Sequence, residues 1–153
     1  MEHSAFICIL LMGTLGFQCT NDETTNDQFV FGVAYGFCAG DCAHFFRIKD
    51  QQLFTDSMER YVSDEYMFKS AALADEKYHL AKSLLDEFPE YLLNHANQTF
   101  GCPDCADQGG YHLLRVINGT TYFWHIDTNS MNQPVEIREY IERMRNVIEE
   151  LRQ

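Results

Sequence analysis

The sequence predicts an α+β fold, in which an antiparallel sheet made of two hairpin regions packs with two amphipathic helices in a single domain over residues 29–153. Three observations support this prediction. Several short segments alternate apolar and other residues with a period of two, as strands do. Two longer segments repeat apolar residues at intervals of three and four, as half-buried helices do. No repeat or change of composition divides residues 29–153, and the expected order is β-β-β-α-loop-β-β-α.

The composition favours an ordered domain that contains β-structure. Hydrophobic residues make up 46% of the chain and aromatic residues 14%, with 12 Phe and 8 Tyr. This content is too apolar for a disordered chain, and aromatic side chains suit pleated surfaces. The formal net charge is −12, and the sequence has no basic stripe. Because an acidic surface repels phosphate backbones, we expect no nucleic-acid partner.

The first three strands are expected at 29–37, 43–49 and 52–56. The first, FVFGVAYGF, places large side chains on one face and small ones, including Gly32 and Gly36, on most of the other. The strands AHFFRIK and QLFTD follow. Because the links between these strands are short, we expect antiparallel pairing.

Helices are expected at 75–88 and 135–151. The first has Asp75 as its N-cap residue, and Pro89 should end or kink it. The second begins after Pro134, which is typical of a helix start. Its apolar residues form a single stripe with Glu and Arg opposite, so it should bury one face.

A second hairpin, with strands at 111–117 and 121–127, is predicted around Asn118-Gly119, a dipeptide typical of type I′ turns. Its second strand contains FWHID, in which His125 and Asp127 share a face. Such a pair could ligate a metal or act as a base, but a solvated sheet face is the interpretation we favour. The other histidines on predicted strands are His44 and His112.

Residues 94–110, between the first helix and this hairpin, show little regular pattern and are expected to form a long loop. Long loops in compact domains are often functional. Asp104, Asp107 and Gln108 would give this loop polar groups that could hold a cation or contact a partner. We favour the simpler interpretation of a surface loop pinned by disulfides.

The N-terminal residues are expected to be an export signal and a tether. The apolar run AFICILLMGTLGF at 5–17 is 13 residues long. A membrane-spanning helix needs about 20 apolar residues, whereas the apolar part of an export signal has about 7–15. The polar, acidic residues that follow are typical of a flexible tether. We predict a signal peptide at 1–18 and a tether at 19–28, the alternative being a buried N-terminal element.

The junction of signal and tether, LGFQCTND, resembles the end of a bacterial lipoprotein signal, where cleavage precedes a cysteine that carries diacylglycerol. Gly16 and Gln18 stand where the usual box has leucine and a small residue, and Leu15 lies one place early. The resemblance implies a lipid anchor on Cys19, with the membrane as a partner. The acidic residues after it resemble a tether that sends some Gram-negative lipoproteins to the outer surface. The implied location is the outer membrane of the cell envelope, on its periplasmic or surface-exposed side.

Four further cysteines lie in the expected domain, in the motifs CAGDC and CPDC. Four cysteines allow three pairings, and disulfides form and persist in the compartments that exported proteins reach. We therefore expect structural disulfides. They are either two local bridges or cross-linked pairs that staple the 94–110 loop to the first hairpin. The residues involved are Cys38, Cys42, Cys102 and Cys105.

Two other interpretations of these cysteines stay open. Tetrahedral zinc on the four thiolates suits the C-x-x-C and C-x-x-x-C spacings, and would rank first in a reducing compartment. Thiol-redox catalysis by CPDC is the second, because the motif has the length and the proline of some oxidoreductase motifs. Those motifs sit at a helix N-terminus, and ADQGG after Cys105 is a poor helix start. We expect no other cofactor.

Residues 29–151 also resemble a family of small, uncharacterised bacterial exported proteins. The resemblance rests on CAGDC at 38–42, LLDEF at 84–88 and the helix at 135–151. The family has a C-x-G-x-C turn, a helix rich in Leu and Phe, and a terminal helix at these places. It commonly has proline where Ala43 stands. Because it commonly has the first cysteine pair without a second, the resemblance implies a bond between Cys38 and Cys42, and it implies no enzymatic activity.

The function expected from these observations is that of a lipid-anchored cell-envelope protein. It would bind a protein or a small molecule, or act as a structural module, without catalysis. The alternative is a zinc-binding or thiol-redox protein that uses the cysteines of CAGDC and CPDC.

Overall fold

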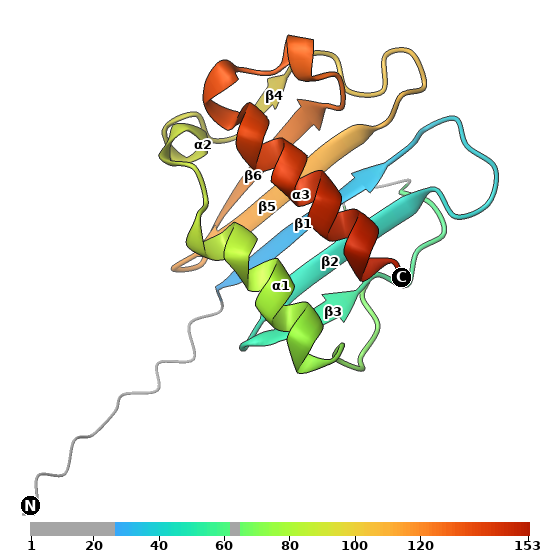
Figure 1. Cartoon of the computed structure of the whole chain (residues 1–153), viewed down its shortest axis with the longest axis vertical. Helices are drawn as coiled ribbons and strands as arrows, with labels where there is room; N and C mark the ends of the chain where they lie inside the picture. Colours follow the sequence, from blue (N-terminus) through green and yellow to red (C-terminus); the bar gives the residue numbers. More distant parts are fainter. Residues whose placement is uncertain (1–26, 62–64) are drawn as a thin grey trace, which may run out of the picture.

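The computed structural model describes residues 27–61 and 65–153, in which helices cover one face of a six-stranded sheet (Figure 1). The expected α+β class is confirmed, and the sheet is mostly antiparallel. In chain order the elements are β1 (Gln28–Ala34), β2 (Ala43–Lys49), β3 (Gln52–Thr55), α1 (Asp75–Asp86), α2 (Glu90–Asn94), β4 (Gln98–Phe100), β5 (Gly110–Ile117), β6 (Thr120–Asp127), the 3₁₀ turns η1 (Ser130–Asn132) and η2 (Val135–Ile137), and α3 (Arg138–Leu151).

Strand β1 lies inside the sheet and joins the two hairpin regions. The strand order is β3-β2-β1-β5-β6-β4, so β1 pairs antiparallel with β2 on one side and with β5 on the other. In this register Phe31 lies between Phe46 and Leu113. Both edges of β1 are hydrogen-bonded, and nearly every residue of the strand is buried. Both faces of β1 are therefore buried, and the alternation places its large side chains on one face and mostly small ones on the other.

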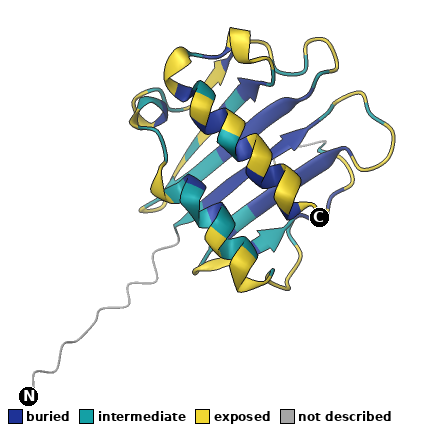
Figure 2. Cartoon of the chain, in the orientation of Figure 1, coloured by how far each residue is buried: buried dark blue, intermediate teal, exposed yellow. Residues whose placement is uncertain are grey.

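Helices α1 and α3 pack on the face that carries the large side chains of β1 (Figure 1). Figure 2 shows the strands beneath them as mostly buried and the outer sides of the helices as exposed. The hydroxyl of Tyr140 on α3 donates to the carbonyl of Leu84 on α1 at 3.0 Å, which ties the helices together. The indole N–H of Trp124 on β6 lies 3.0 Å from the carbonyl of Leu92 and 2.9 Å from that of His95, which ties α2 to the sheet. Helices α1, α2 and α3 therefore pack on the same face of the sheet.

The opposite face of the sheet is partly covered by the chain between β3 and α1. Met58, Tyr61, Tyr66 and Phe68 from this segment pack against a second apolar cluster that includes Phe45. A Cβ on Gly32 would collide with the backbone and ring of β2 residues. The small side of β1 is therefore needed so that the ring of Phe45 can lie across the strand.

The observed order of elements differs from the expected one. The first strand ends at Ala34, because the chain turns there into the CAGDC loop. The first helix ends at Asp86, and Pro89 precedes a separate short helix, α2. The expected loop at 94–110 contains β4, which pairs in parallel with β6. A three-residue strand whose partner lies more than twenty residues away has no local periodicity that predicts it.

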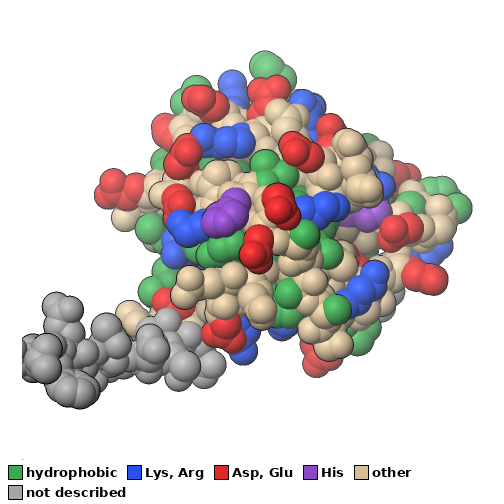
Figure 3. Space-filling model, turned by 60° about the horizontal axis from the view of Figure 1, so that its bottom comes forward, with side chains coloured by type: hydrophobic (Ala, Val, Ile, Leu, Met, Phe, Trp, Pro, Cys, Tyr) green, Lys and Arg blue, Asp and Glu red, His purple; other side chains and the backbone are tan. Residues whose placement is uncertain are grey.

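The expected signal peptide and the lipidation at Cys19 lie outside the described residues. Within residues 27–61 and 65–153, no helix is both long enough and apolar enough to cross a membrane. The chain enters the sheet at the start of β1, away from the loop that follows that strand (Figure 1). On the side shown in Figure 3, acidic and basic side chains are interspersed over the surface.

Candidate functional site

The four cysteines of the described region form two local disulfides. Cys38 is bonded to Cys42 and Cys102 to Cys105, with Cα–Cα distances of 5.7 and 5.5 Å, which are usual for disulfides. The expectation of disulfides is confirmed, in the form of local bridges. While both bonds are present, these four sulfurs cannot act as thiolate ligands. The zinc alternative therefore applies only to a reduced chain.

The two disulfide loops, 35–42 and 101–109, lie beside each other at one end of the sheet, which we call the disulfide end. Asp104 joins them, because its Oδ2 accepts the backbone N–H of Gly36 at 2.8 Å and its Oδ1 that of Gly109 at 3.0 Å. A Cβ on Gly36 would overlap Asp104 Oδ2, so this contact needs a glycine. Asp104, one of the residues considered for a cation, is occupied in holding two loops together.

Gln108, a second polar residue of the long loop, also bonds within that loop. Its side-chain amide donates to the carbonyl of Cys102 at 2.8 Å, and its side-chain oxygen accepts the backbone N–H of Ala106 at 2.7 Å. Asp107 is exposed and has a positive φ of 57°. The loop is thus an internally bonded structure that presents Asp107 to solvent.

Asp127, at the end of β6, braces the CPDC loop from inside the domain. Its carboxylate accepts the backbone N–H groups of Cys102 at 2.9 Å and Asn129 at 2.8 Å, and the side-chain amide of Asn132 at 2.8 Å. Burial alone would raise the pKa of Asp127, but these hydrogen bonds outweigh it and lower the pKa. Asp127 is therefore an ionised structural residue, and it does not act as one unit with His125.

The second face of the sheet holds a cavity of about 450 Å³, bounded by β5, β6, β4 and the segment after β3. We call it the histidine cavity. None of the described residues that line it is Asp, Glu, Lys or Arg. Besides Leu113, Leu114 and Trp124, the described lining consists of Tyr61, Tyr66, Thr99, His112, Thr121, Phe123 and His125.

His112 forms the buried wall of the histidine cavity. It lies directly opposite His125 in the β5–β6 register, and the two ring centroids are 4.1 Å apart. The ring of Tyr61 meets it edge-on at 4.7 Å, and the hydroxyl of Tyr66 lies 3.4 Å from its Nδ1. Burial, helped by the neighbouring His125, lowers the pKa of His112 to about 3. The imidazole is therefore neutral at physiological pH.

His125 connects the cavity to the disulfide end. A Cβ on Gly110 would overlap His125 Nε2 and lie 2.7 Å from Pro103 of the CPDC motif. The bare backbone of Gly110 thus makes room for the imidazole beside the disulfide loop. Burial lowers the pKa of His125 and the carboxylate of Asp104 opposes this shift, so His125 is also mainly neutral at pH 7.

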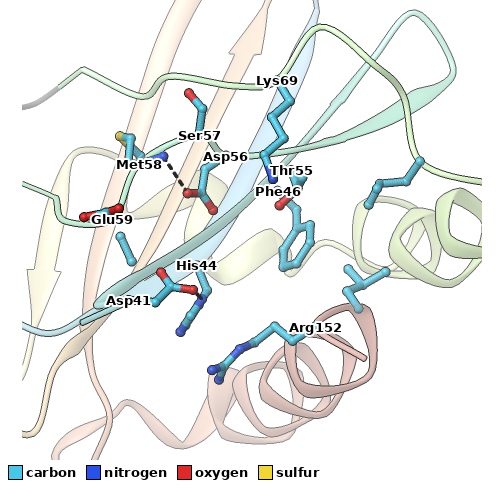
Figure 4. A pocket seen from close by; sticks show the side chains of 13 residues that line it. Asp41, His44, Phe46, Thr55, Asp56, Ser57, Met58, Glu59, Lys69 and Arg152 are labelled. Carbon is cyan, nitrogen blue, oxygen red and sulfur yellow. Dashed lines mark hydrogen bonds and ion pairs between the residues drawn. The ribbon is translucent and has the colours of Figure 1, made fainter. Parts of the chain in front are cut away.

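A second cavity, of about 500 Å³, lies between β2, β3 and the end of α3 (Figure 4). Its lining is charged and includes Asp41, Asp56, Glu59, Lys69 and Arg152. Figure 4 shows Asp41 directed toward His44, whose Nδ1 lies 3.6 Å from Asp41 Oδ2. Burial and the guanidinium of Arg152 lower the pKa of His44 against the effect of the two aspartates.

Asp56 in this charged cavity has a structural role. Its Oδ2 accepts the backbone N–H of Phe45 at 2.7 Å, and its Oδ1 that of Met58 at 3.0 Å. Burial raises the pKa of Asp56 despite these bonds. The carboxylate fastens the start of the covering segment to β2. Asp41 faces His44 and Asp56 bonds to the backbone, so two of the acids in this cavity already have partners within the domain. We regard the histidine cavity as the better candidate site.

Comparisons with known proteins do not assign the chain to a family. No protein-family model and no curated protein matches it. The resemblance to exported lipoproteins therefore stays a prediction. Among residues 27–61 and 65–153, no group of three or more His, Cys, Asp or Glu side chains is arranged to hold a metal ion.

Sequence reasoning identified His112 and His125 as strand histidines but did not place them together. The signal was present, because a two-residue turn at Asn118-Gly119 fixes the hairpin register and puts position 112 opposite 125. Tyr61 and Tyr66 were missed, since the segment after β3 has no regular pattern. Phe123 was assigned to a strand, but its exposure and its place in a cavity depend on the tertiary structure.

Proposed function

We propose that this protein is a lipid-anchored cell-envelope protein that binds a small molecule in the histidine cavity and does not catalyse a reaction. The observation that carries this proposal is a cavity of about 450 Å³ on a hydrogen-bonded sheet, whose described lining contains no Asp, Glu, Lys or Arg. Ligand sites are usually concave and largely preformed, with apolar walls and a few polar groups. The histidine cavity has these properties.

The state of the polar groups favours binding over catalysis. A general acid or base works best with a pKa near the operating pH, whereas burial lowers the pKa of His112 to about 3. The cysteine sulfurs at the disulfide end are bonded in pairs. The low pKa of His112 and the bonded state of the cysteines therefore favour a site that binds a ligand without transferring protons or electrons.

The entry point of the chain fits an anchor on Cys19. β1 starts at Gln28 and runs toward the disulfide end, so a tether attached at its start leaves that end directed away from the anchor (Figure 1). Nine residues of extended chain span at most about 30 Å. Such a tether would hold the domain close to a membrane.

A thiol-redox role is the alternative, and the exposure of Cys102 and Cys105 favours it. Redox-active cysteines are accessible and have a low pKa when reduced. Thiol titration of the reduced chain would test it. A Cys102 or Cys105 thiol with a pKa well below about 8.5 would support a redox role.

Two experiments test the main proposal. Membrane fractionation of cells that express wild type or Cys19→Ala should find the wild type in the outer membrane and the variant released from it. A thermal-shift screen of neutral, acidic and basic small molecules should find compounds that raise the Tm of wild type but not of Phe123→Ala. If no compound gave a shift that depends on Phe123, the binding function would be wrong.

A further inference from the structure

We infer that the histidine cavity binds a neutral carbohydrate. This inference rests on the proposed function and names the class of ligand. Three properties of the lining carry it: the absence of charge, the type of its hydrogen-bonding groups and an exposed aromatic ring.

The lining is neutral in a chain where 22% of residues are charged. None of the described lining residues is Asp, Glu, Lys or Arg, whereas the charged cavity of similar size has both acids and bases of these types. The two imidazoles add no charge at pH 7, because burial lowers the pKa of each. Among the described lining residues, an anionic ligand would find no Lys or Arg, and a cationic ligand would find no carboxylate. The cavity therefore suits a ligand with no net charge.

The polar side chains that line the cavity can each both donate and accept a hydrogen bond. They are the hydroxyls of Tyr61, Tyr66, Thr99 and Thr121 and the neutral imidazoles of His112 and His125. A sugar hydroxyl has the same double capacity. Because the Tyr66 hydroxyl already lies 3.4 Å from His112 Nδ1, the groups best placed to pair with a sugar hydroxyl in either direction are the hydroxyls of Thr99 and Thr121. A ligand group that can only donate hydrogen bonds would pair with the acceptors of the lining and leave its donors unpaired. This match favours a ligand with several hydroxyls.

Phe123 supplies an apolar surface at the rim of the cavity. Its side chain is 48% exposed, although it lies on a strand whose neighbours Trp124 and Ile126 are fully buried. A pyranose ring has one face of C–H groups, which packs against the face of an aromatic ring while its hydroxyls point outward to polar groups. Thr99 on β4 and Thr121 on β6 are also exposed, and both line the same cavity as Phe123. Together they form an open platform with polar edges.

The rings around His112 hold its imidazole in one position. His112 is held by Tyr61 and Tyr66 from the covering segment and by His125 from the neighbouring strand. Its ring orientation is thus fixed before a ligand arrives. Rigid, preorganised groups lose little entropy on binding, which raises the affinity for weakly binding ligands such as sugars.

Saturation-transfer NMR with the full chain tests the inference. The probes are glucose, galactose, mannose and N-acetylglucosamine, their β-linked disaccharides, and glucuronate as an anionic match to glucose. We expect signals from at least one neutral sugar and a weaker or absent signal from glucuronate. Phe123→Ala should weaken binding of that sugar about tenfold, which corresponds to about 1.4 kcal/mol.

Matched variants separate recognition from folding. Thr121→Val keeps the shape of an exposed side chain and removes one hydroxyl, so it should weaken the same sugar without lowering the Tm. Phe37→Ala removes a ring that is 81% exposed at the disulfide end, and should leave binding unchanged. Equal binding by wild type and Thr121→Val, or equal losses in Phe37→Ala and Phe123→Ala, would overturn the inference.

Other probes distinguish failure of the inference from failure of the proposed function. If no neutral sugar bound, but choline or Zn²⁺ bound to wild type and not to Phe123→Ala or His125→Phe, the cavity would be a binding site of another class. If neither the sugars nor these probes gave a signal that depends on the cavity, and the small-molecule screen also found none, both would be overturned.

Discussion

His112 and His125 lie directly opposite each other on β5 and β6, with ring centroids 4.1 Å apart and no acidic residue among the described lining of their cavity. Two imidazoles this close would repel each other if both were protonated. Their contact is therefore compatible only with a largely neutral pair. This relationship has a direct consequence for stability in acid.

Acid should destabilise the protein because His112 resists protonation in the folded state. The folded pKa is lowered to about 3 from 6.5, so the unfolded chain takes up a proton in this range and the folded one does not. The contribution of His112 is complete above pH 6.5 and is lost as the pH falls toward 3, by about 2 kcal/mol at pH 5. Urea unfolding at pH 7 and pH 5 measures this loss.

The matched variant for this prediction is His112→Leu. Leucine has a similar size, so it fills the space beside Tyr61 and His125, but it has no group that takes up a proton. Its stability should change less between pH 7 and pH 5 than that of wild type. His44 and His125, whose pKa values are also lowered, should leave a smaller residual slope. An unchanged slope in His112→Leu would contradict the assignment.

Asp127→Asn should destabilise the protein by about 2–3 kcal/mol, because an amide N–H₂ would replace an oxygen that accepts hydrogen bonds. The carboxylate accepts from Cys102, Asn129 and Asn132, and at least one of these donors would face another donor in the variant. Chemical denaturation measures the change. Asp107→Asn is the control, since Asp107 is exposed, and it should stay within about 0.5 kcal/mol of wild type. Similar losses in both variants would contradict a bracing role for Asp127.

The link between the two disulfide loops predicts a coupling between Gly36 and Asp104. Gly36→Ala should cost about 1–3 kcal/mol, because the new methyl group would overlap the Asp104 carboxylate. In an Asp104→Ala background the same substitution should cost much less. A double-mutant cycle with urea unfolding gives the coupling energy. Additive effects would mean that the loops do not meet as described.

Removing the CPDC disulfide should leave the fold intact. A bridge that closes such a short loop contributes about 2 kcal/mol or less, and Asp104, Gln108 and Asp127 hold the loop independently. Cys102→Ser/Cys105→Ser should therefore show a lower Tm but an unchanged circular dichroism spectrum. Loss of the folded spectrum at room temperature would show that the bond is required for folding.

Elements with strong local signals could be predicted from the sequence. Asn118 and Gly119 have positive φ values of 51° and 77°, as the type I′ turn requires, and the hairpin forms where it was expected. The apolar stripe of the terminal helix is buried as predicted, with Ile141, Met144 and Ile148 in the core. In both cases residues close in sequence determine the structure.

Elements that depend on distant partners could not be predicted in the same way. β4 has only three residues and is defined by parallel pairing with β6. The segment after β3 has no periodicity, yet Tyr61 and Tyr66 pack on Phe45 and form one side of the histidine cavity. The sequence allows both local and cross-linked pairing of the four cysteines, and the structure has the local pairing.

The most direct test of the account is the intact mass of protein purified from membranes, measured before and after reduction and alkylation. We predict a chain that begins at Cys19 and carries acyl groups, with four thiols that react only after reduction. An unprocessed chain, which also contains Cys8 and Cys19, with free thiols at the four domain cysteines would contradict both the anchor and the disulfides. Zinc on those cysteines would then become the leading hypothesis.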